Sequence, residues 1–312
     1  MATASGQMID AREVVRQRLM GRRFELGGAL FEGLLLAAVL VAFAILALLL
    51  GTVIVSGGPV IAERGVDFLT APLASNPDTA GVGQGIFASV VLTVFVIIVA
   101  IPIGIGAAIY LEEYARDTTF TRLINTTVRN LAGVPAIVYG LLGVAFFVTI
   151  AEPLGNNGRN IYAGGLTLGV LVLPIVIITS AEALRAVPWT IREAAFGVGA
   201  TRWEVVRSHV LPYAAPGIFT GTILTLARAF GETAPLLVVG AVAGSFRYTA
   251  DNLFDQLSGP YSALPTIIFT WAKRPEVGFR ANTAAAIIVL LVALLTVNAV
   301  AIYLRNRFER RW

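Results

Sequence analysis

Residues 86–111 read IFASVVLTVFVIIVAIPIGIGAAIYL, a run without a charged side chain. About 20 consecutive apolar residues are enough for a helix to cross the hydrocarbon core of a bilayer. Similar runs recur along the 312-residue chain and give six candidate spans: 31–55, 86–111, 130–150, 163–183, 211–242 and 282–304. The sequence therefore predicts an all-α polytopic membrane protein with six transmembrane helices.

The composition of the chain also indicates that much of its surface faces lipid. Hydrophobic residues make up 57% of the chain, charged residues only 13%, and the mean hydropathy is +0.80. The chain has no cysteine and one histidine, His209, which excludes disulfide frameworks, thiolate metal sites and histidine clusters. The net charge of +4 comes from basic residues beside the spans, which usually set topology. We expect contact with membrane lipid and no binding of nucleic acid.

Basic residues are unevenly divided between the two sides of the predicted membrane domain. Most of the 23 lysines and arginines precede the first span, follow the second and fourth spans, or lie in the tail. The positive-inside rule places that side of a cytoplasmic (inner) membrane, and with it both termini, in the cytoplasm. The expected parts are a cytoplasmic basic segment 1–30, a transmembrane domain 31–304 with a cytoplasmic loop at about 185–209 and an external loop at about 244–281, and a cytoplasmic basic tail 305–312.

The external loop contains a short apolar run, Leu264-Pro-Thr-Ile-Ile-Phe-Thr-Trp271. This run is too short to cross a bilayer. We predict that it forms a re-entrant or surface-lying helix.

The cytoplasmic loop carries several signals of compact local structure. Pro188 suits the start of a helix because it has no N–H to donate. Gly197 and Gly199 offer a helix end, and Thr201 with Glu204 has the spacing of a capping box. These signals predict a helix, a glycine turn and a second helix.

Two interpretations of this loop follow from its residues. Exposed Ala194, Ala195 and Trp203, set among charged neighbours, are suited to docking a cytoplasmic partner. Tryptophan and arginine are equally typical of a helix that lies at the lipid headgroups. The residues alone leave both open.

The loop also resembles a known family signature. Glu193-Ala-Ala, three residues, Gly199, nine residues and then His209-Val-Leu-Pro212 resemble the EAA loop of bacterial ABC importer permeases, although His209 replaces the usual isoleucine. The resemblance implies a type I ABC importer permease fold and a coupling helix, from about Glu193 to Glu204, seated in a groove of an ATP-binding subunit. The residues it implies for coupling are Glu193, Ala194, Ala195, Gly199, Thr201, Arg202, Trp203 and Glu204.

The fifth candidate span carries two charges, Arg228 and Glu232, four residues apart and hence on one helical face. Ionisable groups inside a membrane are costly and usually face a bundle interior or a polar cavity. A guanidinium there can attract an oxyanion through its bidentate fork, with Glu232 holding it in place. The alternative is a buried salt bridge that only fixes the position of the helix.

A second resemblance concerns the substrate. The run from Ala227 to Leu237, ARAFGETAPLL, is similar to the fifth span of bacterial phosphate importer permeases, and the likeness extends over most of the chain from the second span onward. It implies that Arg228 and Glu232 take part in phosphate translocation. It also implies a second permease subunit and an external phosphate-binding protein as partners.

The chain lacks the means to hydrolyse ATP by the common route. Its only lysine, Lys273, is not preceded by a glycine-rich phosphate loop. We therefore expect ATP and Mg²⁺ to be bound by a separate subunit and no cofactor to be bound by this chain.

The sequence disfavours two other classes of function and leaves a different substrate or subunit identity open. An intramembrane enzyme is disfavoured, because the predicted spans contain no nucleophile–base pair, carboxylate dyad or metal ligands. An ion-driven secondary transporter is disfavoured by the lack of internal repeats. A permease for molybdate or sulfate, or the sister phosphate permease subunit, stays open.

Overall fold

The computed structural model describes residues 26–242 and 252–308, and this part of the chain contains helices and no strands. Residues 1–25 of the predicted basic segment, 309–312 of the predicted tail and 243–251 of the external loop lie outside the described residues. The chain divides into two compact units, 1–52 and 53–312.

The described part of the first unit belongs to helix α2 (Leu26–Thr70). Every residue from 27 to 50 is exposed, and most of these residues are apolar. Lipid tolerates such a surface and water does not. The helix continues into the second unit and kinks at Gly65, whose φ of +45° is readily adopted by glycine.

Six helical stretches are long and apolar enough to cross a membrane, which confirms the predicted number among the described residues. They are Gly27–Thr70, Gly83–Tyr114, Ala136–Leu154, Asn156–Arg185, Arg202–Gly231 and Val277–Arg307. Several predicted bounds differ from these helices. The first helix extends to Thr70 and not to 55, the third span begins after Pro135 and not at 130, and the fifth runs from Arg202 to Gly231 and not from 211 to 242.

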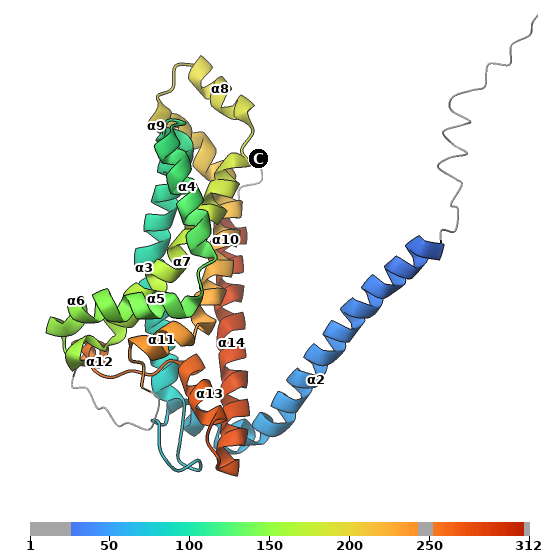
Figure 1. Ribbon diagram of the computed structural model, residues 1–312, viewed down its shortest axis with the longest axis vertical. Helices are drawn as coiled ribbons and strands as arrows, with labels where there is room; N and C mark the ends of the chain where they lie inside the picture. Colours follow the sequence, from blue (N-terminus) through green and yellow to red (C-terminus); the bar gives the residue numbers. More distant parts are fainter. Residues whose placement is uncertain (1–25, 243–251, 309–312) are drawn as a thin grey trace, which may run out of the picture. The chain divides into compact units, whose positions relative to one another are not determined.

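In the second unit, the longest helices run along one another and shorter ones fill the ends and the middle (Figure 1). The elements after α2 are α3 (Gly83–Ile109), the π-helical turn η1 (Tyr110–Tyr114), α4 (Thr119–Ala132), α5 (Ala136–Leu142), η2 (Gly143–Val148), α6 (Thr149–Ala151), η3 (Glu152–Leu154), η4 (Asn156–Gly158), α7 (Ile161–Arg185), α8 (Trp189–Gly197), α9 (Arg202–Val205), η5 (Val206–Val210), α10 (Leu211–Gly231), α11 (Ala234–Val239), α12 (Leu253–Ser258), α13 (Leu264–Ala272) and α14 (Val277–Phe308).

Helix α7 forms the centre of the second unit and packs most extensively against α3 and α10. Small residues allow the close approach. A Cβ added to Gly104 of α3 would lie 2.6 Å from a methyl of Val176, and one added to Gly221 of α10 would lie 2.5 Å from Thr179. Membrane helices lack a hydrophobic force between them, so such close packing supplies much of their association.

We expect Gly104→Leu to destabilise the folded protein by about 1–3 kcal/mol, because an overpacked side chain must displace α3 or α7. Gly106→Leu is a matched control in the same helix, since nothing lies within 4 Å of a Cβ there. Thermal unfolding of the purified protein in detergent measures both. Equal unfolding temperatures for the two variants would contradict the packing argument.

The two ends of this bundle have different apolar clusters. Residues of α7, α8, α9, η5 and α10 pack together at one end with Ala108 of α3. At the opposite end, Phe68, Trp271 and Phe279 pack with residues of α13 and α14. These are called the α8 end and the α13 end (Figure 1).

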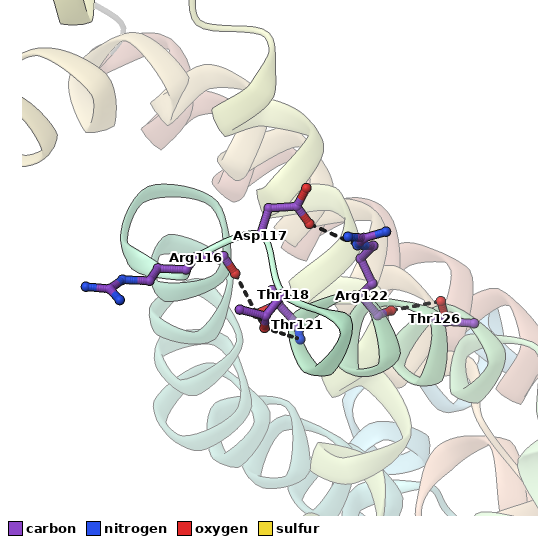
Figure 2. Close-up of polar contacts among 6 residues, drawn as sticks. All are labelled: Arg116, Asp117, Thr118, Thr121, Arg122 and Thr126. Atoms are coloured by element: carbon purple, nitrogen blue, oxygen red, sulfur yellow. Dashed lines mark hydrogen bonds and ion pairs between the residues drawn. The ribbon is translucent and has the colours of Figure 1, made fainter.

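The segment between the second and third spans is largely helical. It forms the amphipathic helix α4, whose N-cap Thr118 accepts a hydrogen bond from the Thr121 N–H. Figure 2 shows this start, where the Thr121 hydroxyl donates to the Arg116 carbonyl and Arg122 pairs with Asp117 at 3.0 Å. Helix α4 has no buried residue and packs along α7.

The short apolar run of the external loop forms α13, which confirms a helix too short to span a bilayer. It is not a surface-lying helix, because Leu264, Ile267 and Trp271 are at most 2% exposed. The hydroxyl oxygen of Ser89 in α3 accepts a 2.9 Å hydrogen bond from the Leu264 N–H, which ties the start of α13 to α3. Helix α13 therefore belongs to the core of the second unit.

Candidate functional site

The fifth span is interrupted between α10 and α11. Helix α10 ends at Gly231, the backbone of Glu232 is extended, and α11 begins at Ala234 with Pro235 in its first turn. Proline lacks an N–H and clashes with the carbonyl four residues earlier, which favours an interruption of the helix at this point. Helices α5 and α11 pack together here and lie crosswise to α3, α7 and α14 (Figure 1).

Arg228 and Glu232 lie on either side of this helix end. The Arg228 Nε donates to the Glu232 Oε1 at 3.2 Å. The two charges are therefore paired as expected, but Glu232 is the C-cap and not part of a continuous helix in mid-span. A cation in the last turn of α10 is favoured by the partial negative charge of the helix end.

The pair is open on the arginine side. The Arg228 side chain is 50% exposed and that of Glu232 is 16% exposed. This geometry contradicts a salt bridge buried on all sides within this chain. It leaves guanidinium surface accessible to an anion.

Sequence reasoning missed Tyr139 of α5. This residue is 6% exposed, its hydroxyl donates a hydrogen bond to the Leu131 carbonyl at 2.8 Å, and its helix packs against α11 at the break. Helix α5 reaches the site because Gly140 lets Pro235 of α11 approach it closely. Nothing in the sequence spacing connects Tyr139 with a residue so far along the chain.

The loop after α7 forms a compact element, α8 and α9. Helix α8 ends in a Schellman motif: the Ala200 N–H donates to the Ala195 carbonyl at 3.1 Å and the Gly199 N–H to the Phe196 carbonyl at 3.0 Å. Gly199 has a φ of +87°, the left-handed conformation that a Schellman motif requires at this position and that glycine adopts without strain. The predicted capping box of Thr201 and Glu204 is confirmed, with both reciprocal hydrogen bonds present.

The predicted helix, glycine turn and second helix are confirmed as α8, which follows Pro188, the turn at Gly199, and α9. The segment from Glu193 to Glu204, which the resemblance gives as the coupling helix, therefore includes the end of α8, this turn and the start of α9. One expectation about exposure was wrong. Ala195 was expected to be exposed and is 4% exposed, because it packs with Leu184 and Val205.

The other predicted coupling residues are exposed at the α8 end. They are Glu193, Ala194, Gly199, Thr201, Arg202, Trp203 and Glu204. Sequence reasoning missed that Trp189, Phe196 and Val198 add exposed apolar surface to the same element. The Trp189 indole N–H donates to Glu193 at 2.8 Å, which fixes the direction of that carboxylate.

Residues 100–312, which include α7, the α8–α9 element and the α10–α11 break, match the family of binding-protein-dependent transport system inner membrane components. The chain belongs to this family. It is therefore a permease of an ABC importer and a multi-pass protein of the inner membrane. No group of histidine, aspartate and glutamate in the described part of this permease could hold a metal ion.

Individual relatives agree with this assignment. The probable ABC transporter permease protein YqgI of Bacillus subtilis is 30% identical over 265 residues, which are 82% of this permease and 88% of that protein. The phosphate transport system permease protein PstA of Mycobacterium leprae is 38% identical over 215 residues, 68% of this permease and 67% of that protein.

The fold also matches a solved structure. A chain of a bacterial alginate ABC transporter, in complex with an alginate pentasaccharide-bound periplasmic protein, aligns with a TM-score of 0.59 and 14% identity. The alignment covers 96% of this permease and 98% of that chain. The predicted six-helix importer permease fold is confirmed.

Proposed function

We propose that this permease is the PstA-type subunit of an ATP-driven importer that carries inorganic phosphate into the cytoplasm. The observation that carries the proposal is the Arg228–Glu232 pair at the interruption of the fifth span. Interrupted helices in transporters commonly mark the substrate path, because backbone and charged groups there can face a cavity. A relative named as a phosphate permease, 38% identical, supports the choice of substrate.

The chemistry of the pair favours a protonated oxyanion. The exposed guanidinium attracts the negative oxygens, and Glu232, 3.2 Å from Arg228 Nε, places a hydrogen-bond acceptor next to it. Phosphate keeps a P–OH donor at neutral pH, whereas sulfate and molybdate have none. The carboxylate would therefore accept a hydrogen bond from the P–OH of phosphate, and it would repel sulfate and molybdate, which have no donor to offer it.

The energy would come from a separate ATP-binding subunit, PstB-like, which binds the ATP and Mg²⁺. The exposed surface of α8 and α9 supports docking of such a subunit, because a rigid element with aromatic and charged side chains can be pushed as a unit. The second permease would be PstC-like, and a PstS-like protein would deliver phosphate from outside. In this arrangement the α8 end and both termini face the cytoplasm, and this chain itself binds no cofactor.

Uptake of radiolabelled phosphate by the reconstituted complex tests the substrate. We expect unlabelled phosphate and arsenate to compete, since both carry an acidic hydroxyl, and sulfate and molybdate not to compete. Competition by sulfate or molybdate as strong as that by phosphate would contradict the proposal.

A further inference from the structure

Arg192 of α8 is one of the few buried charged residues in the described part of the permease, at 8% exposed. Its side chain forms a charge pair with Glu113 of η1, with Nη2 to Oε1 at 2.6 Å, and both side chains are 9% exposed. The two residues are 79 positions apart in the sequence. This pair therefore links the end of α3 directly to α8, two segments that are far apart in the sequence.

The same guanidinium also holds the end of α7. Its Nη1 donates to the Val187 carbonyl at 2.8 Å and its Nη2 to the Leu184 carbonyl at 3.0 Å. Carbonyls at a helix C-terminus lack partners within the helix and carry partial negative charge, so a cation there is favoured. One side chain from α8 thus binds both α7 and α3.

Little else connects α8 to α3. The backbone of α8 lies mainly against α9 and η5. Apart from Arg192, its one buried residue is Ala195. A cavity of about 530 Å³ lies between α8 and the ends of α3 and α7, and Glu113 and Arg192 both line it. The pair therefore lies at the wall of a cavity that side chains do not fill.

A neighbouring ion pair is more exposed and does not involve α8. Arg185 of α7 pairs with Glu112 of η1, but the arginine side chain is 44% exposed and neither residue belongs to α8. Exposed ion pairs contribute little, whereas removing one partner of a buried pair leaves an uncompensated charge. The Arg185–Glu112 pair is therefore a natural control for the Arg192–Glu113 pair.

We propose that Arg192 is a positioning residue that transmits movement of α8 to the end of α3 as well as to α7. This inference rests on the proposed coupling role of α8. When a partner subunit displaces α8, the Arg192–Glu113 pair makes α3 follow, so three core helices move together. Without the pair, α8 moves with α7 and α10, to which the chain connects it, and α3 lags.

The absence of cysteine makes a direct test possible. In the complete complex, Glu113→Cys with Arg192→Cys breaks the ion pair and provides two unique thiols in this chain. We expect ATP hydrolysis to continue and phosphate uptake per ATP to fall roughly tenfold, the size of effect that about 1.4 kcal/mol produces. Bridging the thiols with a flexible bis-thiosulfonate reagent should restore uptake per ATP, and a reductant should abolish it again.

Glu112→Cys with Arg185→Cys is the matched control, for which uptake per ATP should stay near the wild-type value with or without the bridge. If the double cysteine variant at 113 and 192 does not assemble, Glu113→Gln tests the proposal instead, because glutamine has nearly the shape of glutamate and lacks its charge. A lower ratio of uptake to hydrolysis supports the proposal, and an unchanged ratio overturns it.

The outcomes separate the two levels of the argument. A wild-type complex without phosphate-stimulated hydrolysis would contradict the proposed function itself. A normal wild-type complex whose double cysteine variant is fully coupled, or stays uncoupled after bridging, would overturn only the role of Arg192.

Discussion

Arg228→Gln should lower phosphate uptake by roughly 10- to 100-fold, because hydrogen bonds to a charged group contribute about 1.5–3 kcal/mol. Glutamine keeps a polar side chain but is shorter, and it loses the positive charge and the guanidinium fork. The charge is half exposed at the α10–α11 break, where an anion can reach it. The measurement is the initial rate of radiolabelled uptake into vesicles, corrected for the amount of assembled complex.

Arg122→Gln is the matched control for the loss of one arginine. Arg122 pairs with Asp117 at the start of α4, and both side chains are more than 70% exposed (Figure 2). An exposed pair contributes at most about 1 kcal/mol, so uptake should change by no more than about fivefold. Undiminished uptake by Arg228→Gln at normal protein levels would remove Arg228 from the phosphate path.

Gly199→Val should uncouple ATP hydrolysis from phosphate uptake. The Schellman motif holds residue 199 at a φ of +87°, which costs a residue with a Cβ about 1–2 kcal/mol and a β-branched one more. Nothing lies within 4 Å of an added Cβ, so the effect comes from the backbone alone. The turn between α8 and α9 should open, and the measurement is phosphate taken up per ATP hydrolysed.

Two alanine variants control this prediction. Gly199→Ala should lower the ratio in the same direction but less, since alanine is not β-branched. Gly197→Ala, inside α8 and with equally open space around its Cβ, should leave the ratio unchanged. If Gly199→Val hydrolyses ATP and transports phosphate in the wild-type ratio, the α8–α9 turn has no role in coupling.

Local signals in the sequence were accurate where the structure depends on neighbours in the chain. The number of spans, the capping box at Thr201 and the glycine turn at Gly199 follow from apolar run length, side-chain hydrogen bonding and backbone sterics. The end of the fifth span was predicted too late, because the apolar run continues past Pro235 while the helix ends at Gly231.

Contacts between distant segments could not be predicted in the same way. Ala195 was wrongly expected to be exposed, because its burial depends on Leu184 and Val205 packing over it. The sequence shows Glu113 and Arg192 as two ordinary charges beside spans. Their pairing needs the π turn at the end of α3 and the return of the chain through α7.

The amino-acid sequence by itself determined that this chain is a six-span membrane protein with a compact loop after its fourth span, because lipid demands apolar runs and turns demand particular residues. Only the tertiary structure decided which residues from distant segments of the chain meet. Arg192 pairs with Glu113 at the wall of a cavity, because helices from separate parts of the chain pack side by side. Such pairings depend on the close approach that residues such as Gly104 and Gly140 permit, and a linear pattern does not record which helix will lie against them.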